Sequence, residues 1–158
     1  MKSKKIQIEY KHFTKDDELP KHISEIIEKS KEAVQNAYAP YSKFKVGAAV
    51  RLESGKIVLG NNQENIAYPS GICAERVALF SAGALYPTEK VIQLAIASEG
   101  DLIDEKALLS PCGACRQVMA EVITRQGCSF ELIILNPDNS VLLFSKAEDL
   151  MPLLFGHE

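Results

Sequence analysis

Hydrophobic and polar positions along the chain change their period several times, and each period predicts a different element. In "ISEIIEKSKEAVQNAY", residues 23–38, the apolar residues return every three or four positions. This spacing predicts an amphipathic helix with one buried face. The helix should end before Pro40, because a residue that precedes proline is pushed out of the helical region.

Shorter apolar runs follow and predict strands. The segments 45–52 ("KVGAAVRL") and 56–60 ("KIVLG") flank "ESG", a pattern typical of a β-hairpin. A polar loop then leads to a helix that begins at Cys73. Buried strands are predicted at 91–98, 130–135 and 141–144, a further helix after Pro111, and a terminal helix or tail at 146–155.

The N-terminal residues stand apart from this main pattern. In residues 5–13, "KIQIEYKHF", the positions Ile6, Ile8 and Tyr10 alternate with polar residues, and the segment predicts a short strand ahead of the domain. We therefore divide the chain into an N-terminal extension, 1–22, and one domain, 23–158. A solvated or sheet-extending tail is favoured over a regulatory arm. The order of elements in the domain predicts a three-layer α/β fold with a mixed sheet of about five strands.

Length, charge and hydropathy narrow the class of protein. The 158 residues fit one domain with a hydrophobic core. The formal net charge is -3, whereas proteins that bind polynucleotides usually carry a basic face, so a small molecule is the expected partner. No apolar run approaches the roughly 20 residues of a membrane span. The N-terminus lacks the apolar core of a signal peptide, so the expected location is the cytoplasm.

Cysteines cluster in two short motifs. Cys73 stands in "CAE", and Cys112 and Cys115 form C-x-x-C in "PCGAC". Where no signal sequence precedes them, clustered cysteines are more often metal ligands or catalytic groups than disulfides. C-x-E followed by P-C-x-x-C is the three-cysteine form of the zinc deaminase signature. The two motifs therefore predict one zinc ion bound by these three residues.

The neighbours of the cysteines suit a catalytic zinc site. Both motifs are expected at helix N-termini, where the helix dipole and free N–H groups favour thiolates. Three protein ligands leave one position of a tetrahedral zinc to water, whose pKa the metal lowers to about 7. Glu75 is expected to shuttle protons to and from that water. Arg76 is expected to hydrogen-bond a ligand sulfur and to offset the negative charge of three thiolates.

Structural roles are the alternatives to this interpretation. Cysteine is commonly a buried apolar residue, and Glu and Arg commonly occupy the first turn of a helix. A structural four-cysteine zinc site would recruit Cys128, but its place before a strand favours a buried core thiol. A thioredoxin-like pair of Cys112 and Cys115 would leave Cys73 and Glu75 without a role.

Three separated segments carry a resemblance to a known family. In order they are "YAPYSKFKVGAAV", "NNQENIAYPSGICAER" and "SPCGACRQVMAE". With them, the chain resembles the small, homotetrameric, zinc-dependent cytidine deaminases from about Ile23 to Phe155. The resemblance implies the α/β/α sandwich of that family. It also implies hydrolytic deamination of cytidine and 2′-deoxycytidine to the uridines plus ammonia, by attack of zinc-bound hydroxide on C4, as part of pyrimidine salvage.

The same resemblance implies the residues that contact substrate. Asn62 and Glu64 in "NQE" match the residues that hold the ribose hydroxyls, and Phe44 matches the aromatic that packs on the pyrimidine. The backbone around Ala74 and Cys112 is expected to orient the base.

Two further aromatic residues are implied at subunit boundaries. Tyr68 matches a family position near the subunit interface, and Phe155 matches a C-terminal phenylalanine contributed to the site of a neighbouring subunit. Without the family, each would pass as an ordinary surface or core aromatic.

Two rival functions stay open on the residues alone. The nearest is an aminohydrolase of a cytosine nucleoside antibiotic, which would share the zinc chemistry. From a different class, a non-catalytic zinc-stabilised module predicts a closed four-ligand zinc and tolerance of Glu75→Gln. Deaminases of nucleic-acid bases usually pair P-C-x-x-C with a histidine ligand and a basic surface, and this sequence has neither in place.

Overall fold

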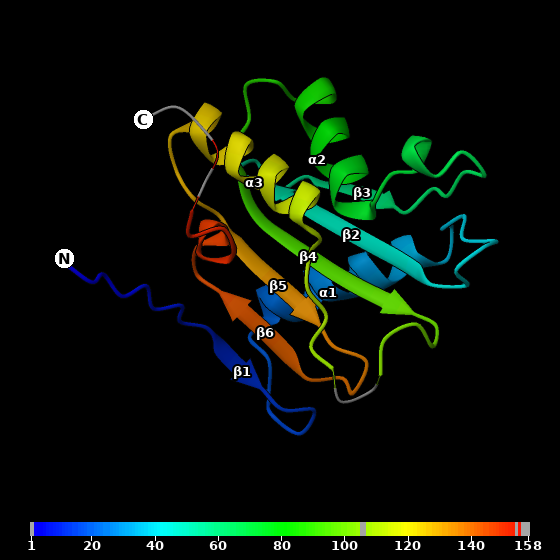
Figure 1. The fold of residues 1–158 in the computed structure, drawn as a ribbon, viewed down its shortest axis with the longest axis horizontal. Coiled ribbons are helices and arrows are strands. Elements are labelled where there is room, and N and C mark those ends of the chain that lie inside the picture. Colours follow the sequence, from blue (N-terminus) through cyan, green and yellow to red (C-terminus); the bar gives the residue numbers. More distant parts are fainter. Residues whose placement is uncertain (1, 105–106, 154, 156–158) are drawn as a thin grey trace.

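A six-stranded mixed sheet forms the middle layer of the protein, with strand order β1-β6-β5-β4-β2-β3 (Figure 1). The computed structural model describes residues 2–104, 107–153 and 155. Neighbouring strands are antiparallel except β4 and β5, which run parallel. The strands are β1 (Lys11–Phe13), β2 (Lys45–Leu52), β3 (Ile57–Asn61), β4 (Val91–Glu99), β5 (Glu131–Leu135) and β6 (Val141–Phe144).

Helices cover both faces of this sheet. One face carries α1 (Lys21–Val34), and the other carries α2 (Ala74–Leu85) and α3 (Gly113–Gln126) (Figure 1). Short 3-10 helices lie at η1 (Tyr68–Ser70) and η2 (Ala147–Leu150). The predicted α/β/α class and the predicted order of helices and strands are confirmed.

Strand periodicity explains why two separate cores form. Adjacent residues of β2 point to opposite faces, so Ala48 packs in the core under α2 and α3 while Ala49 packs in the core under α1. Ile23 and Ile26 fill the α1 side. The periodic apolar face predicted for the first helix is therefore the buried one.

Two glycines let helices approach the sheet closely. A Cβ on Gly60 of β3 would lie 2.4 Å from the backbone nitrogen of Ala78 in α2. A Cβ on Gly47 of β2 would lie 2.2 Å from the carbonyl oxygen of Ser30 in α1. Only glycine permits such contacts, and the contact at Gly60 holds the N-terminal half of α2 against the sheet.

The sheet has six strands rather than about five because the extension adds one. Lys11, His12 and Phe13 pair antiparallel with β6, so the tail extends the sheet, as was favoured. The strand predicted within residues 5–13 is therefore confirmed for its last three residues only: residues 2–10 form no strand and lead away from the sheet (Figure 1). A strand needs a partner, and β6 ends at Phe144, which the ring of Tyr10 contacts at 5.2 Å between centroids.

The C-terminal segment is mostly a tail. The 3-10 helix η2 is the helical part of the predicted terminal element, and Met151–Leu153 and Phe155 belong to no helix or strand. Across the described residues, no helix has both the length and the apolar character that crossing a membrane requires.

Candidate active site

Three cysteine thiols meet where α2 and α3 begin. Cys73 is the N-cap of α2 and Cys112 the N-cap of α3, so both cysteine motifs lie at helix N-termini, as predicted. The Sγ atoms of Cys73 and Cys112 are 3.9 Å apart, and those of Cys112 and Cys115 are 3.5 Å apart. All three Sγ atoms lie within 4.8 Å of one another, which suits ligands of one metal ion.

The protonation of these thiols fits a cation binder. A hydrogen bond from Cys115, reinforced by Arg76, lowers the pKa of Cys73 to about 5. The same hydrogen bond and burial raise the pKa of Cys115. Without a metal, the cluster therefore favours deprotonation of Cys73 and opposes deprotonation of Cys115. A divalent cation removes that conflict, because metal ligation deprotonates coordinating thiols. By its donor set and its geometry, the cluster is suited to hold a zinc ion.

Glu75 lies in the first turn of α2 beside the thiols. It is 5% exposed and lines the same cavity as Cys73 and Cys112. Burial raises the pKa of this carboxyl, and the neighbouring Cys73 acts in the same direction. A carboxyl whose pKa lies above the ordinary range can accept and return a proton near neutral pH, as a general acid and base must.

Arg76 touches the cluster from the same helical turn. Its Nη2 donates to Sγ of Cys73 at 3.7 Å, and this contact raises the pKa of the guanidinium. Its buried Nε has no partner among the described residues. The structure thus places Arg76 against a ligand sulfur, the location expected from the sequence.

A cavity of about 750 Å³ opens beside the thiols. Its wall is formed by residues from the stretches 41–46 and 62–76, by Ile96 of β4, and by residues from 102–103 and 109–112. It contains most of the residues predicted to contact substrate. Those that line it are Phe44, Asn62, Glu64 and Tyr68, together with the thiols of Cys73 and Cys112.

Asn62 holds the backbone around Phe44. Its Oδ1 accepts the N–H of Val46 at 2.8 Å, and its Nδ2 donates to the carbonyl of Phe44 at 2.9 Å. The ring of Phe44 is 9% exposed and belongs to the larger core. One amide therefore connects the residue predicted to hold the sugar to the residue predicted to pack on the base.

Glu64 holds the loop that precedes Phe44. Its carboxylate accepts the N–H of Tyr41 at 2.8 Å, the N–H of Ser42 at 3.3 Å, and the hydroxyl of Ser42. The Ser42 hydroxyl also accepts the N–H of Phe44 at 3.0 Å. The contact with the Ser42 hydroxyl is the main reason that the pKa of Glu64 lies below its ordinary value.

The backbone of this loop takes an uncommon conformation. Lys43 has a φ of 58°, in the left-handed region that side chains other than glycine rarely adopt. Its carbonyl packs so close to Gly100 that a Cβ there would lie 2.5 Å away. Ser42 and Lys43 were not predicted from the sequence as residues that shape the site. The short polar run before Phe44 was the available signal, but it carries no information about its partner Glu64.

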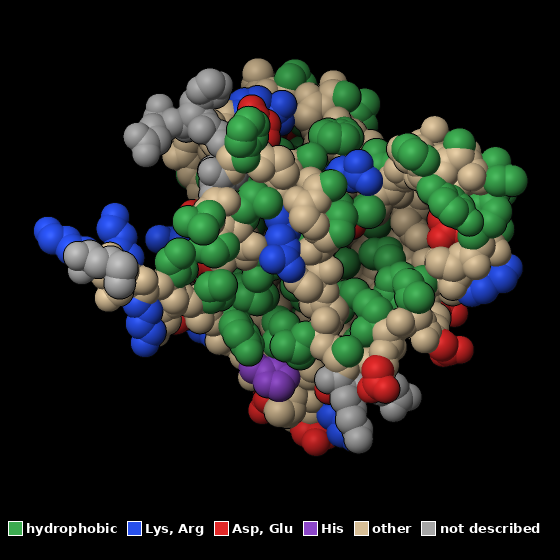
Figure 2. Space-filling model, in the orientation of Figure 1, with side chains coloured by type: hydrophobic (Ala, Val, Ile, Leu, Met, Phe, Trp, Pro, Cys, Tyr) green, Lys and Arg blue, Asp and Glu red, His purple; other side chains and the backbone are tan. Residues whose placement is uncertain are grey.

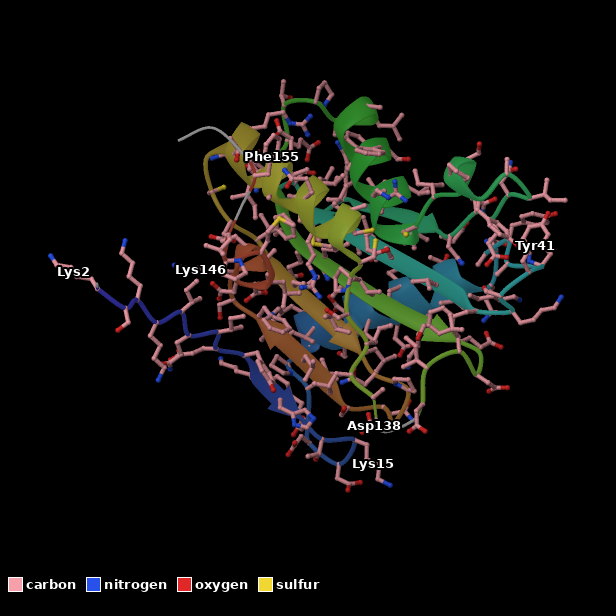
Figure 3. All side chains as sticks on the ribbon, in the orientation of Figure 1. Lys2, Lys15, Tyr41, Asp138, Lys146 and Phe155 are labelled. Carbon is pink, nitrogen blue, oxygen red and sulfur yellow. The ribbon has the colours of Figure 1, made fainter. Side chains whose placement is uncertain are left out.

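Ala74 and Phe155 lie outside the cavity wall. Ala74 is the first residue of α2 and is fully buried, so only its backbone can serve the site. The side chain of Phe155 is 88% exposed, and Figure 3 places it on the opposite side of the molecule from Tyr41. Tyr68, by contrast, lines the cavity although it is 76% exposed, and its ring meets that of Tyr41 edge-on.

Cys128 is not a core thiol. It is exposed, which makes the prediction of a buried residue wrong. The reason is the turn before it: Gly127 ends α3 with a φ of 71°, and β5 begins only at Glu131. Cys128 therefore lies in the connection between the two elements. It does not belong to the cluster of thiols found among the described residues.

A second contact that holds a loop of the site also could not be predicted from the sequence. The N–H of Leu109 donates to Oδ1 of Asn136 at 2.9 Å, and Asn136 is 3% exposed. Its amide in turn donates to the hydroxyl of Ser140 at 3.0 Å. This buried pair anchors the loop that leads to Ser110 and the cysteines of α3.

Comparison with known proteins agrees with this geometry. The family model described as "Cytidine and deoxycytidylate deaminase zinc-binding region" matches residues 20–128. A cytidine deaminase from Sporosarcina psychrophila is 46% identical over 99 residues, which cover 63% of this chain and 68% of that protein. A probable cytidine deaminase from Dictyostelium discoideum is 40% identical over 139 residues, covering 85% and 86% of the two chains.

Solved structures show the same relationship. The crystal structure of cytidine deaminase from Burkholderia pseudomallei matches this fold with a TM-score of 0.67 at 38% sequence identity. The match covers 87% of this chain and 100% of that one. The cytidine deaminase from Mycobacterium tuberculosis matches with a TM-score of 0.63 at 30% identity, covering 85% and 97%.

Proposed function

The chain belongs to the cytidine and deoxycytidylate deaminase family, and we propose that it hydrolyses cytidine and 2′-deoxycytidine to the corresponding uridines and ammonia. One observation carries the proposal. Three thiols arranged as ligands of one ion and a buried glutamate line or adjoin a single cavity. Cys73, Cys112 and Cys115 would hold a zinc ion, which supplies a Lewis acid that activates water at neutral pH.

Glu75 moves the protons of the reaction in this proposal. It accepts a proton from the water that attacks C4 and delivers it to N3, which permits a tetrahedral C4. It then takes the proton of the new C4 hydroxyl and passes it to the amino group, so that the C4–N bond breaks, ammonia leaves and C4 becomes a carbonyl. The raised pKa of the buried carboxyl supports this role, because the same group must be a base first and an acid afterwards.

Asn62, Glu64 and Phe44 orient the nucleoside. The loop contacts described above use one donor and one acceptor position of the Asn62 amide and three acceptor positions of the Glu64 carboxylate. An amide has a second N–H and a carboxylate about four lone-pair positions, so each side chain retains capacity for a sugar hydroxyl. Phe44 supplies an aromatic wall for the pyrimidine. The backbone around Ala74 and Cys112 would orient the base.

A homotetramer is part of the proposal. Phe155 and Tyr68 are exposed aromatics, and only Tyr68 lines the cavity of its own chain. Apolar side chains also lie exposed on the face that carries α2 and α3 (Figure 2), among them Phe80 at 53% and Leu85 at 66%. In a tetramer Phe155 would reach the site of a neighbouring subunit. Sedimentation analysis tests this, and a fully active monomer would contradict it.

The setting follows from the substrate. A nucleoside deaminase acts in pyrimidine salvage, and we propose a cytoplasmic enzyme whose partner is a small molecule rather than nucleic acid or a membrane. The net charge of -3 supports the choice of partner, because polynucleotide binders need a basic surface.

Ammonia release from cytidine by the purified protein tests the proposed function. Glu75→Ala should keep its zinc and lose about 10²- to 10⁴-fold in turnover, the usual contribution of a general acid and base. Glu28→Ala, on the exposed side of α1 and therefore on the opposite face of the sheet, is the matched control and should turn over normally. Unchanged activity in Glu75→Ala would remove Glu75 from the mechanism. No release from cytidine by the native, zinc-loaded protein would point to a related aminohydrolase substrate or to a structural zinc module.

A further inference from the structure

We infer that Arg116 is a positioning residue that fixes the loop before the zinc ligand Cys112 against the C-terminal segment of the chain. The inference rests on the proposed function for its catalytic consequence. Its structural basis is a set of contacts that neither the cysteine motifs nor the predicted substrate residues include.

The guanidinium of Arg116 donates three hydrogen bonds. Nε donates to the carbonyl of Pro111 at 2.8 Å, and Nη2 donates to the hydroxyl of Ser110 at 2.8 Å. Nη1 donates to the carbonyl of Leu150 at 3.0 Å. Ser110 and Pro111 line the cavity and immediately precede Cys112. One side chain therefore connects the cavity wall to the last residue of η2.

The need for such a contact follows from the backbone of the loop. Residues 107–112 belong to no helix or strand, so no ladder of hydrogen bonds satisfies their backbone groups. Pro111 is buried, and a buried carbonyl without a partner is costly. Arginine meets this need because its planar fork presents several donors in fixed directions, whereas lysine offers a single flexible ammonium group.

The location of Arg116 makes its contacts relevant to the metal ligands. It directly follows Cys115, and its side chain returns to the residue that directly precedes Cys112. The guanidinium thus closes the turn from Cys112 to Cys115 and restrains the relative position of the two thiols. Contacts of this kind around metal ligands commonly contribute tenfold or more to affinity or activity.

Gln117 extends the same arrangement toward the end of the chain. Its Nε2 donates to the carbonyl of Phe155 at 2.9 Å. Two consecutive side chains of α3 therefore hold the C-terminal segment at Leu150 and at Phe155. The position of that segment, and of the exposed Phe155 ring, is set from the helix that carries Cys115.

Zinc release from the loaded protein into an excess of chelator tests the inference. Arg116→Lys keeps the charge but loses the fork, and we expect zinc release about tenfold faster, with a turnover number about tenfold lower and a KM within about twofold of the native value. Arg125→Lys is the matched control, because Arg125 lies on the exposed side of the same helix and should release zinc at the native rate. Thermal unfolding of each variant is measured beside the release rate.

Ser110→Ala supplies a second and milder variant. It removes one acceptor of the guanidinium and should accelerate zinc release by about threefold in a protein with near-native unfolding temperature. A folded Arg116→Lys protein with native zinc release would overturn the inference. If Arg116→Lys does not fold, native release from Ser110→Ala overturns it instead. Because zinc release requires no turnover, a protein inactive on cytidine would refute the proposed function without deciding the role of Arg116.

Discussion

The side-chain amide of Asn62 donates a hydrogen bond to the carbonyl of Phe44 at 2.9 Å. The oxygen of the same amide accepts the N–H of Val46 at 2.8 Å, so one side chain bonds the backbone on both sides of Lys45, where β2 begins. The carbonyl belongs to Phe44, whose ring lines the cavity, and the N–H belongs to the residue two positions later. Asn62 therefore builds the site as well as facing it, and its loss should affect more than one contact.

Asn62→Ala should raise the KM for cytidine by at least about tenfold and lower the free energy of unfolding by about 1–3 kcal/mol. The stability is lost because two backbone groups of a partly buried strand are left without partners. Steady-state kinetics and denaturant unfolding measure the two effects. Asn61→Ala is the control, since the side chain of Asn61 bonds only to the exposed Gln63 in the contacts described and does not line the cavity. Equal effects of the two substitutions would contradict this role.

Glu64 should make stability depend on pH in the acid range. The hydroxyl of Ser42, followed by the N–H groups of Tyr41 and Ser42, holds the pKa of Glu64 below its ordinary 4.5. A carboxyl with a lowered folded pKa stabilises the protein above its unfolded pKa, and this contribution is lost as the pH falls through the folded value. The unfolding temperatures of native protein and Glu64→Gln should therefore differ most above about pH 5 and converge below 4.5.

Thermal unfolding between about pH 3 and pH 7 measures this convergence. Glu121→Gln serves as the control, because no loop contacts of the kind made by Glu64 are found for Glu121 among the described residues. A constant difference between native protein and Glu64→Gln across the range would show that Glu64 does not act through its charge.

Cys128 should be the one rapidly reacting thiol of the zinc-loaded protein. It is exposed and lies outside the thiol cluster, whereas Cys112, which is also exposed, belongs to that cluster with Cys73 and Cys115. An aromatic disulfide reagent should consume about one thiol per chain before zinc is removed and more than two afterwards, because metal ligation blocks the reaction of a thiolate. Cys128→Ser should abolish the fast reaction and leave deamination unchanged. A fast thiol that persists in Cys128→Ser would mean that the cluster is open to reagent.

The N-terminal extension should protect the edge of the sheet. Without β1, the strand β6 would present unpaired backbone groups, and such edges pair with other chains. Deleting residues 2–13 should lower the free energy of unfolding by roughly 2 kcal/mol, through lost pairing and the lost packing of Phe13. It should also produce self-association that grows with concentration in sedimentation velocity. Deleting residues 2–9 leaves β1 in place and should change neither property; equal behaviour of the two truncations would contradict edge protection.

Local patterns were sufficient where the chemistry lies within one turn of helix. Cys112, the N-cap of α3, and Cys115 in its first turn are three positions apart, and Glu75 follows Cys73 by two positions at the start of α2. Such spacings determine which side chains share a turn whatever the rest of the fold does. The strands of the core behaved in the same way, because an apolar run between turn residues is buried in any α/β domain.

Local patterns failed where a partner decides the outcome. The alternation of Ile6, Ile8 and Tyr10 is that of a strand, but pairing occurs only at Lys11–Phe13, beside the four residues of β6. Cys128 resembles a core thiol next to an apolar strand, but the left-handed turn at Gly127 leaves it exposed. For the strand, the deciding contact is with β6, which is distant in sequence. For Cys128, the deciding feature is the backbone conformation of Gly127.

By itself, the sequence determined most of the helices and strands, and it predicted three metal ligands and a neighbouring glutamate, because each depends on periodicity or on spacing within one element. Only the tertiary structure decided that Cys73 meets Cys112 at 3.9 Å, that Glu64 binds the loop at Ser42, and that Arg116 reaches Leu150. These contacts join residues that are 39, 22 and 34 positions apart. Their formation depends on how the helices pack on the sheet, and no local pattern specifies that geometry.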